Sequence, residues 1–143
     1  MMMHKRPEYD DFPLKTYDKF RYADTDRQGH VNNALFSTFL ETGRTELLYA
    51  AEPLHAENAS FVIVSQKLDL LTEIRWPGKV DIGTAVTRVG NSSLSLFQGL
   101  YQDGRLAAVA DTVIVQMDDH TRKSKPLSPE TIERLKQYLV EVQ

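Results

Sequence analysis

The hydrophobic period of the chain changes once, and this change limits the folds that the chain can adopt. Over residues 31–51, apolar-face positions recur every four residues, at Leu35, Phe39, Gly43 and Leu47, which is typical of an α-helix. We expect Gly43 to let another backbone come close to this helix, because a glycine there otherwise costs about 1 kcal/mol. From residue 60 onward the period falls to two, as in β-strands.

Four strands are expected after the helix, at residues 60–72, 79–89, 93–102 and 105–117. Asp103-Gly104 predicts a two-residue hairpin turn between the last two. The last strand is apolar on both faces, which indicates burial on both faces. The helix can cover one face, and we expect a second copy of the chain to cover the other.

The residues before the long helix are also assigned. Residues 1–14 are expected to be a loose lead-in and residues 15–143 a single domain. Residues 15–22 have the composition of a strand, and one of its faces carries Thr16, Asp18, Phe20 and Tyr22.

Ser128-Pro129 predicts the start of a short terminal helix, as N-cap and first-turn proline. Its expected apolar stripe consists of Ile132, Leu135, Leu139 and Val142. The order of strand, long helix, four strands and short helix predicts an α+β fold. In this fold an antiparallel sheet of about five strands wraps the long central helix.

Composition excludes several classes of protein. The chain has 143 residues, 41% hydrophobic and 26% charged, as expected of one soluble globular domain. A net charge of −3 gives no general attraction to nucleic acid. The sequence lacks cysteine, a secretory leader and a long apolar run, so we expect a cytoplasmic protein without membrane contact, disulfides or a thiolate metal site.

The string ADTDRQGHVNN, at residues 23–33, concentrates polar groups between the first strand and the long helix. This position sets carboxylates opposite the free N–H groups of a helix N-terminus, which bind anions. A carboxylate that faces an oxyanion donor suits acyl transfer.

The string has two other interpretations. Asp24, Asp26 and Gly29 match the start of a calcium-binding EF-hand loop, but Leu35 stands where the bidentate glutamate belongs, so we dismiss calcium. In a purely structural loop, the aspartates form side-chain turns and Asn32 or Asn33 caps the helix. That plainer interpretation stays open on residue types alone.

The stretch RYADTDRQGHVNNALFSTFLETGRTELL resembles the signature of the 4-hydroxybenzoyl-CoA thioesterase-like branch of the hot-dog fold superfamily. The segments KLDLLTEIRWPGKVDIGTAV, VGNSSLSL and TRKSKPLSPE follow in that family's order, so the resemblance covers about residues 15–135. It implies hydrolysis of acyl-CoA or related pantetheine thioesters. It also implies a homodimer or dimer of dimers, no metal, and no cofactor beyond the coenzyme A of the substrate.

The resemblance also assigns the catalytic residues. Asp26 matches the family's catalytic carboxylate, which acts as nucleophile or as general base on water. Asn33, seven positions on, matches the residue whose backbone N–H is the oxyanion donor. Many relatives have an aromatic residue or histidine near this position, whereas this chain has two amides, Asn32 and Asn33, which affects the acyl preference more than the chemistry.

Two residues of the active-site region, besides Gly29 of the string, are predicted to contact substrate. His30 assists as a base or holds the loop, and its plainer role is a structural hydrogen bond. Glu41 orients a water or pairs across a dimer, and its plainer role is an exposed carboxylate near Arg44.

Two other segments are predicted to contact coenzyme A. Ser92 and Ser93 lie where the family often contacts pantetheine or phosphates, although an ordinary strand connection explains them as well. Arg122 and Lys123, with Lys125 nearby, offer charges for the phosphates, although such clusters are usually solvated surface.

Two alternative functions stay open. A hot-dog hydratase or dehydratase typically uses a histidine paired with an acid, which would move the chemistry to His30. A non-catalytic acyl-CoA binding module would bind the ester without releasing thiol. The sequence contains no Gly-x-Ser-x-Gly, His-Glu-x-x-His or P-loop motif, which argues against the common serine, zinc and nucleotide enzymes.

Overall fold

The structure, a computed structural model, describes residues 2–50 and 52–143. Its main sheet consists of Leu14–Lys19 (β2), Ala59–Leu70 (β3), Lys79–Val89 (β4), Ser93–Gln102 (β5) and Arg105–Asp118 (β6). The strands are antiparallel, in the order β2-β4-β5-β6-β3. The remaining elements are Met2–Met3 (β1), Tyr9–Asp11 (η1), Tyr22–Asp24 (η2), Ala34–Tyr49 (α1), Pro129–Lys136 (α2) and Glu141–Val142 (β7).

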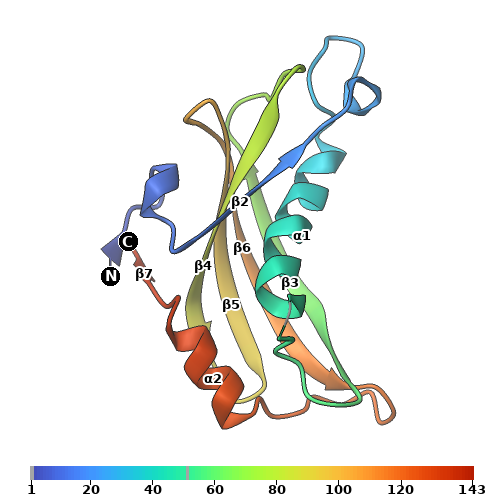
Figure 1. Cartoon of the computed structure of the whole chain (residues 1–143), viewed down its shortest axis with the longest axis vertical. Coiled ribbons are helices and arrows are strands. Elements are labelled where there is room, and N and C mark those ends of the chain that lie inside the picture. The colour runs from blue at the N-terminus through green and yellow to red at the C-terminus, as the bar shows by residue number, and fades with distance from the viewer. Residues whose placement is uncertain (1, 51) are drawn as a thin grey trace.

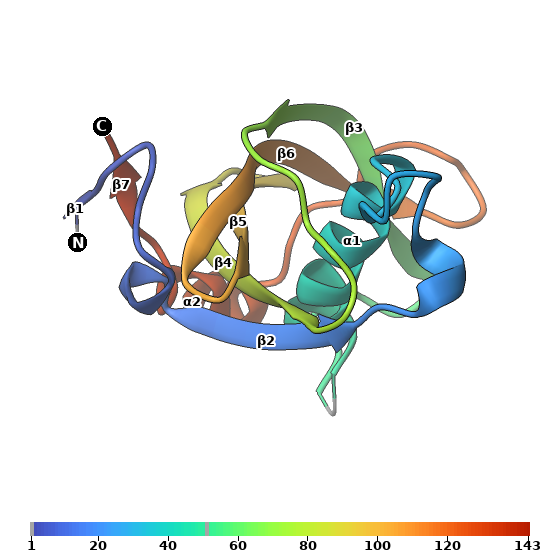
Figure 2. The same ribbon diagram turned by 90° about the horizontal axis from the view of Figure 1, so that it is seen from above.

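The sheet curves around α1, so the helix lies along its concave face (Figures 1 and 2). Phe36, Phe39 and Leu40 of α1 are buried against Ile82 of β4 and Leu100 of β5. This confirms the predicted α+β fold, with a long helix wrapped by five antiparallel strands and a short helix near the C-terminus. Among the described residues, no helix has the length and apolar character needed to cross a membrane.

Gly43 lies at the closest approach of α1 to the sheet. A Cβ atom at this position would lie 2.7 Å from Ile82 Cγ2, 2.8 Å from Gln98 Nε2 and 2.9 Å from Thr84 Oγ1. The buried Gln98 amide is itself fixed, because it donates to the Leu40 carbonyl at 3.1 Å and to Thr84 Oγ1 at 3.0 Å. The expected close approach is confirmed, although its partners are side chains rather than backbone.

Several helix and strand boundaries differ from the predicted ones. The long helix begins at Ala34 rather than residue 31. Val31 instead forms an antiparallel bridge with Thr25, and its N–H donates to the Ile74 carbonyl at 2.7 Å. The other predicted end, Ala51, lies outside the described residues. The first strand ends at Lys19, so the prediction for Tyr22 was wrong, and this residue is exposed in η2.

The Asp103-Gly104 turn is confirmed. Both residues have positive φ, 52° and 80°, as a two-residue type I′ hairpin requires.

The predicted loose lead-in was wrong. Met3 and Phe12 are 2% and 1% exposed and pack with Phe97, Tyr101 and Val140 on the convex face of the sheet. The Tyr101 hydroxyl donates to the Pro7 carbonyl, and β1 pairs with β7, so both ends of the chain lie on this side (Figure 1). Much of the cover that we expected from a second copy therefore comes from the chain's own ends.

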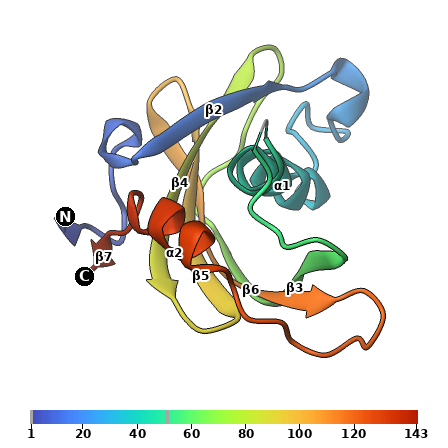
Figure 3. The same cartoon turned by 60° about the horizontal axis from the view of Figure 1, so that its bottom comes forward.

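The terminal helix α2 lies beside β4 (Figure 3). Leu135 is buried as predicted, but α2 ends at Lys136 and Leu139 is exposed. Val142 belongs to β7, and Val140 is buried in place of Leu139. The predicted stripe therefore holds only for the residues inside α2.

We expect Ser128→Ala to lower the free energy of unfolding by about 1 kcal/mol. The Ser128 hydroxyl oxygen accepts a hydrogen bond from the Thr131 N–H at 3.1 Å, which the variant loses. Urea denaturation measures the effect, with the exposed helical Ser37→Ala as a control that should change stability by less than about 0.5 kcal/mol. Equal stability of the two variants would contradict the capping role.

Candidate active site

The predicted site is a tight hairpin that connects η2 to α1. Thr25 and Val31 pair across it, and the Asp26 N–H donates to the His30 carbonyl at 2.7 Å. Gly29 closes the turn with φ +80°, a conformation that side chains rarely adopt. The string at residues 23–33 thus forms a defined structure that fixes Asp26 relative to the helix start.

The carboxylate of Asp26 has one fixed oxygen and one free oxygen. Its Oδ1 accepts backbone hydrogen bonds from Gln28 at 2.8 Å and from His30 at 3.1 Å. Within residues 2–50 and 52–143, nothing donates a hydrogen bond to Oδ2, and the side chain is exposed. The side-chain turn of the plainer interpretation is therefore present, and it leaves Oδ2 without a donor among the described residues.

Asn33 is the N-cap residue of α1, and its side chain makes no capping bond. Asn32 takes that role, because its Oδ1 accepts from the Ala34 N–H at 3.0 Å. In the described part of the chain, the Asn33 N–H has no acceptor. A free N–H at the positive end of a sixteen-residue helix is what an oxyanion donor requires.

His30 is directed toward Glu73. Its Nε2 lies 3.8 Å from a Glu73 carboxylate oxygen, and Arg75 donates to the same carboxylate at 2.7 and 3.1 Å. The hydrogen bond from Arg75 lowers the pKa of Glu73 below its usual value. This arrangement favours the structural role of His30, and the sequence reasoning missed Glu73 and Arg75 because their pairing depends on the fold.

Trp76 lies next to this loop and contacts it. Its backbone N–H donates to the Gly29 carbonyl at 3.4 Å, and its ring meets that of Tyr22 edge-on at 5.3 Å. Trp76 therefore both supports the loop and presents a half-exposed aromatic surface beside it.

Glu41 is exposed on α1, and Arg44 follows it one turn later with only 6% of its surface exposed. Burial lowers the pKa of the Arg44 guanidinium, and the charge of Glu41 opposes this change. The sequence reasoning treated Arg44 only as a neighbour of Glu41. The sequence around Arg44 does not indicate its burial, because the strand residues next to it, Phe61, Ile63 and Ile114, are far along the chain.

Ser92, Ser93, Arg122 and Lys123 lie at the other end of the sheet. The β4–β5 connection and the loop after β6 are at the bottom of Figure 1, whereas the segment before α1 is at the top. The Ser92 carbonyl accepts from the Gln116 N–H at 2.8 Å, and Ser93 Oγ accepts from Arg88 at 2.9 Å. A single chain does not bring these residues to Asp26, so their role in binding coenzyme A stays a prediction.

The fold and the site together define a class of protein. A long helix wrapped by five antiparallel strands is the hot-dog fold, and an exposed carboxylate before a free helix N-terminus suits acyl transfer. Residues 20–135 match the family described as the thioesterase-like superfamily. The chain belongs to this family, which confirms the resemblance seen in the sequence.

Individual relatives agree with this assignment. The acyl-CoA thioester hydrolase YbgC of Escherichia coli O157:H7 is 27% identical over 131 residues, which cover 88% of this chain and 95% of YbgC. A thioesterase of Thermus thermophilus, solved with coenzyme A and zinc, is 28% identical, with a TM-score of 0.77 over 89% of this chain and 94% of that one.

The PA5185 protein of Pseudomonas aeruginosa PAO1 has the same fold. It superimposes with a TM-score of 0.85 at 22% identity, over 96% of this chain and 99% of that one.

Proposed function

We propose that the protein hydrolyses acyl-CoA thioesters to a free acid and coenzyme A. The observation that carries this proposal is the pair formed by the free Asp26 oxygen and the free Asn33 N–H within one short segment. The similarity to an acyl-CoA thioester hydrolase and to a thioesterase that binds coenzyme A supports it.

In the proposed reaction, the Asn33 N–H donates to the thioester carbonyl oxygen as negative charge develops there. The helix terminus is positive and already in place, so it stabilises this charge without reorganisation. Asp26 then attacks the carbonyl carbon, which expels the thiolate and leaves a mixed anhydride for water to hydrolyse. Alternatively, Asp26 accepts a proton from the water that attacks.

The hydrogen bonds to Oδ1 of Asp26 serve both routes. Backbone donors from Gln28 and His30 fix the orientation of the carboxylate and leave Oδ2 to face the substrate. A positioned nucleophile or base of this kind removes part of the entropic barrier.

A homo-oligomer is part of the proposal. Strand β3 is the last strand of the sheet, and it exposes Ile63, Val64 and Leu70 at 45%, 57% and 49%. An edge strand with such residues favours pairing with another strand. Antiparallel pairing of two β3 strands sets the Ala59 end of one copy against the Leu70 end of the other.

Such pairing would also bring the distant basic residues close to an active site. Ala59 pairs with Asp118, so the loop that carries Arg122 and Lys123 lies at the Ala59 end. In a dimer this loop would approach the other copy's Leu70 end, where the Asp26 hairpin lies. A cytoplasmic location, expected from the cysteine-free sequence, belongs to the same proposal.

We expect Val64→Lys to convert the dimer to a monomer and to lower kcat/KM at least about tenfold, because a charge on an edge strand blocks pairing. Light scattering and thiol release measure the two effects. Tyr17→Lys is the matched control, since Tyr17 is 62% exposed on the opposite edge strand. A Val64→Lys protein that stays dimeric would exclude this interface.

Crotonyl-CoA separates the three functions in one assay. A thioesterase releases thiol and leaves the double bond intact. A hydratase consumes the enoyl absorbance without thiol release, and a binding module does neither. We expect thiol release. Hydration without thiol release would contradict the thioesterase function and support the hydratase function.

A further inference from the structure

A cavity of about 230 Å³ lies between α1, β3 and β6. Its walls are mostly apolar and include Leu48, Phe61 and Ile114, while Glu41 and Arg44 supply its charged groups. Because β3 is the last strand in the sheet order, the cavity adjoins an edge of the sheet. A second chain that pairs with β3 would therefore lie beside this cavity.

Arg44 is the buried charge of this cavity. Only 6% of its surface is exposed, yet it makes no hydrogen bond or ion pair within the described chain. Its Nη1 is fully shielded and has no partner there. Arginine keeps its charge in proteins, and a buried charge without a partner is costly. The guanidinium therefore needs an acceptor from outside the described chain.

Two other groups of this region also lack partners. Gln66, on the edge strand β3, has a buried Nε2 that donates to no acceptor in the described part of the chain. Glu41 is exposed at the cavity, and within residues 2–50 and 52–143 it forms no ion pair with Arg44 or any other base. This region thus combines buried donors without acceptors and an acid without a base, which a separate chain can complete.

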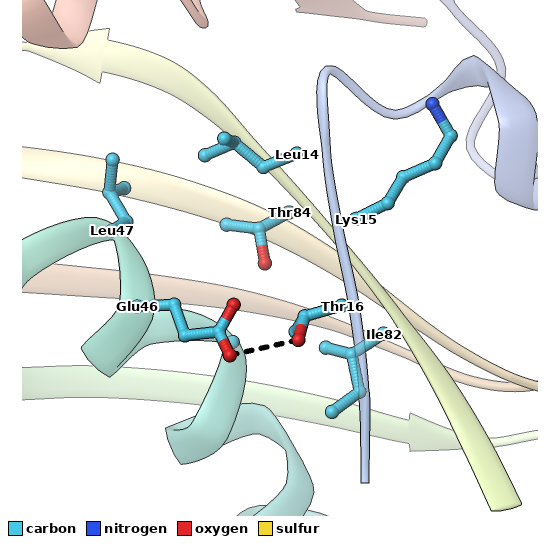
Figure 4. A pocket seen from close by; sticks show the side chains of 8 residues that line it. Leu14, Lys15, Thr16, Glu46, Leu47, Ile82 and Thr84 are labelled. Carbon is cyan, nitrogen blue, oxygen red and sulfur yellow. Dashed lines mark hydrogen bonds between the residues drawn. The ribbon is translucent and has the colours of Figure 1, made fainter. Parts of the chain in front are cut away.

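A second cavity, on the other side of α1, shows the contrast. It measures about 110 Å³ and lies between α1 and β2 (Figure 4). There the Glu46 carboxylate accepts from the Thr16 hydroxyl at 2.9 Å, and the Lys15 ammonium points away to donate to the Phe12 carbonyl at 2.7 Å. Both charged groups of that cavity have partners within the chain, whereas Arg44 does not.

The position of the cavity along β3 suits a two-fold contact. Ile63 lines the cavity, and Ile63 and Val64 lie near the middle of the strand Ala59–Leu70. Antiparallel pairing centred on this strand puts the two-fold axis next to the cavity, and paired strands lie about 4.8 Å apart. The cavities of the two copies then face each other across the axis.

The charges at the cavity are complementary to themselves under such an axis. Glu41 and Arg44 are three positions apart on one face of α1. A two-fold axis makes every contact reciprocal, so an acid of one copy that meets a base of the other does so twice. The same surface therefore supplies both the missing acceptor and the missing base.

We propose that the cavity is completed by a second copy of the chain, in which Glu41 of each copy accepts from the partner's Arg44. The planar guanidinium can donate to both carboxylate oxygens, which fixes the position of one copy along the other. The inference rests on the β3 interface of the proposed function and names the charged pair that selects its partner.

The first test reverses one charge. We expect Glu41→Arg to raise the dimer dissociation constant at least about tenfold in sedimentation equilibrium, because two guanidinium groups then face each other twice in every dimer. Glu46→Arg makes the same charge change on the opposite side of α1, where Glu46 is also exposed. This matched control should dimerise like the wild type.

The second test mixes two proteins that each carry one reversal, Glu41→Arg and Arg44→Glu. Each alone places like charges against each other, whereas a mixed dimer joins opposite charges at both contacts. We expect native mass spectrometry to show mixed dimers well above about half of all dimers, the share that random pairing gives. A mixed share at or below that value, with both variants folded, would overturn the inference.

The first test decides alone if Arg44→Glu does not fold. A monomeric wild-type protein, or a Glu41→Arg dimer as tight as the wild-type dimer, would overturn the inference. Thiol release, assayed separately, distinguishes it from the proposed hydrolysis. Release by a dimer that is indifferent to Glu41→Arg refutes only the ion pair, whereas a charge-dependent dimer that releases no thiol refutes only the hydrolysis.

Discussion

Replacement of Asp26 by asparagine is expected to lower kcat for acyl-CoA hydrolysis at least about 100-fold, or roughly 2.7 kcal/mol of transition-state stabilisation. The amide oxygen can still accept the backbone hydrogen bonds that Gln28 and His30 donate to Oδ1. The hairpin therefore keeps its structure. The free oxygen becomes an amide nitrogen, which can neither attack a carbonyl carbon nor accept a proton from water.

The matched control is Asp24→Asn, two residues earlier. The Asp24 carboxylate accepts from the Arg21 N–H at 2.7 Å and from its guanidinium at 2.9 Å, and these bonds lower the pKa of Asp24. The Arg21 side chain of this pair is exposed and the Asp24 side chain is 12% exposed. An asparagine keeps an oxygen that can accept the bond from the Arg21 N–H, so we expect activity close to that of the wild type. If Asp26→Asn retained near-normal turnover while Asp24→Asn did not, the catalytic assignment would be wrong.

Gly43→Ala is expected to lower the free energy of unfolding by about 1–3 kcal/mol, the usual effect of excess volume in a packed core. Helix propensity alone predicts the opposite sign, since alanine is favoured over glycine by about 1 kcal/mol. The added methyl would lie within 3.0 Å of Ile82, Thr84 and Gln98. Two of these are β-branched and stiff, and Gln98 is held by two hydrogen bonds, so none can move aside cheaply.

Thr38→Ala provides the control for this substitution. Thr38 is exposed on α1, where alanine should be neutral or slightly stabilising. Chemical denaturation of both variants gives the two free energies. A Gly43→Ala protein as stable as Thr38→Ala would mean that the helix does not approach the sheet as closely as the structure shows.

The sequence predicts the parts of this fold that depend on local patterns. The four-residue period identifies α1, and the two-residue period identifies strands β3 to β6 within a few residues. Asp103-Gly104 identifies its hairpin because the turn requires positive φ at both positions. The local string indicates only a carboxylate before a helix start, and the resemblance to the family is what singles out Asp26 and Asn33 within it.

The features that were missed depend on contacts between distant segments. Met3 and Phe12 are isolated apolar residues in a polar stretch, and only the convex face of the sheet makes them part of a core. The helix begins after Val31, whose N–H donates to the Ile74 carbonyl, more than forty positions away. The burial of Arg44 on α1 is likewise a feature that the local hydrophobic period does not predict.

Steady-state release of coenzyme A from a panel of acyl-CoAs by the purified wild-type protein tests the central claim most directly. Free thiol and free acid are both counted. Hydrolysis at the Asp26 site predicts saturable turnover with equal molar amounts of the two products. A folded protein that bound these esters but released neither product would contradict the proposed function and favour a binding module.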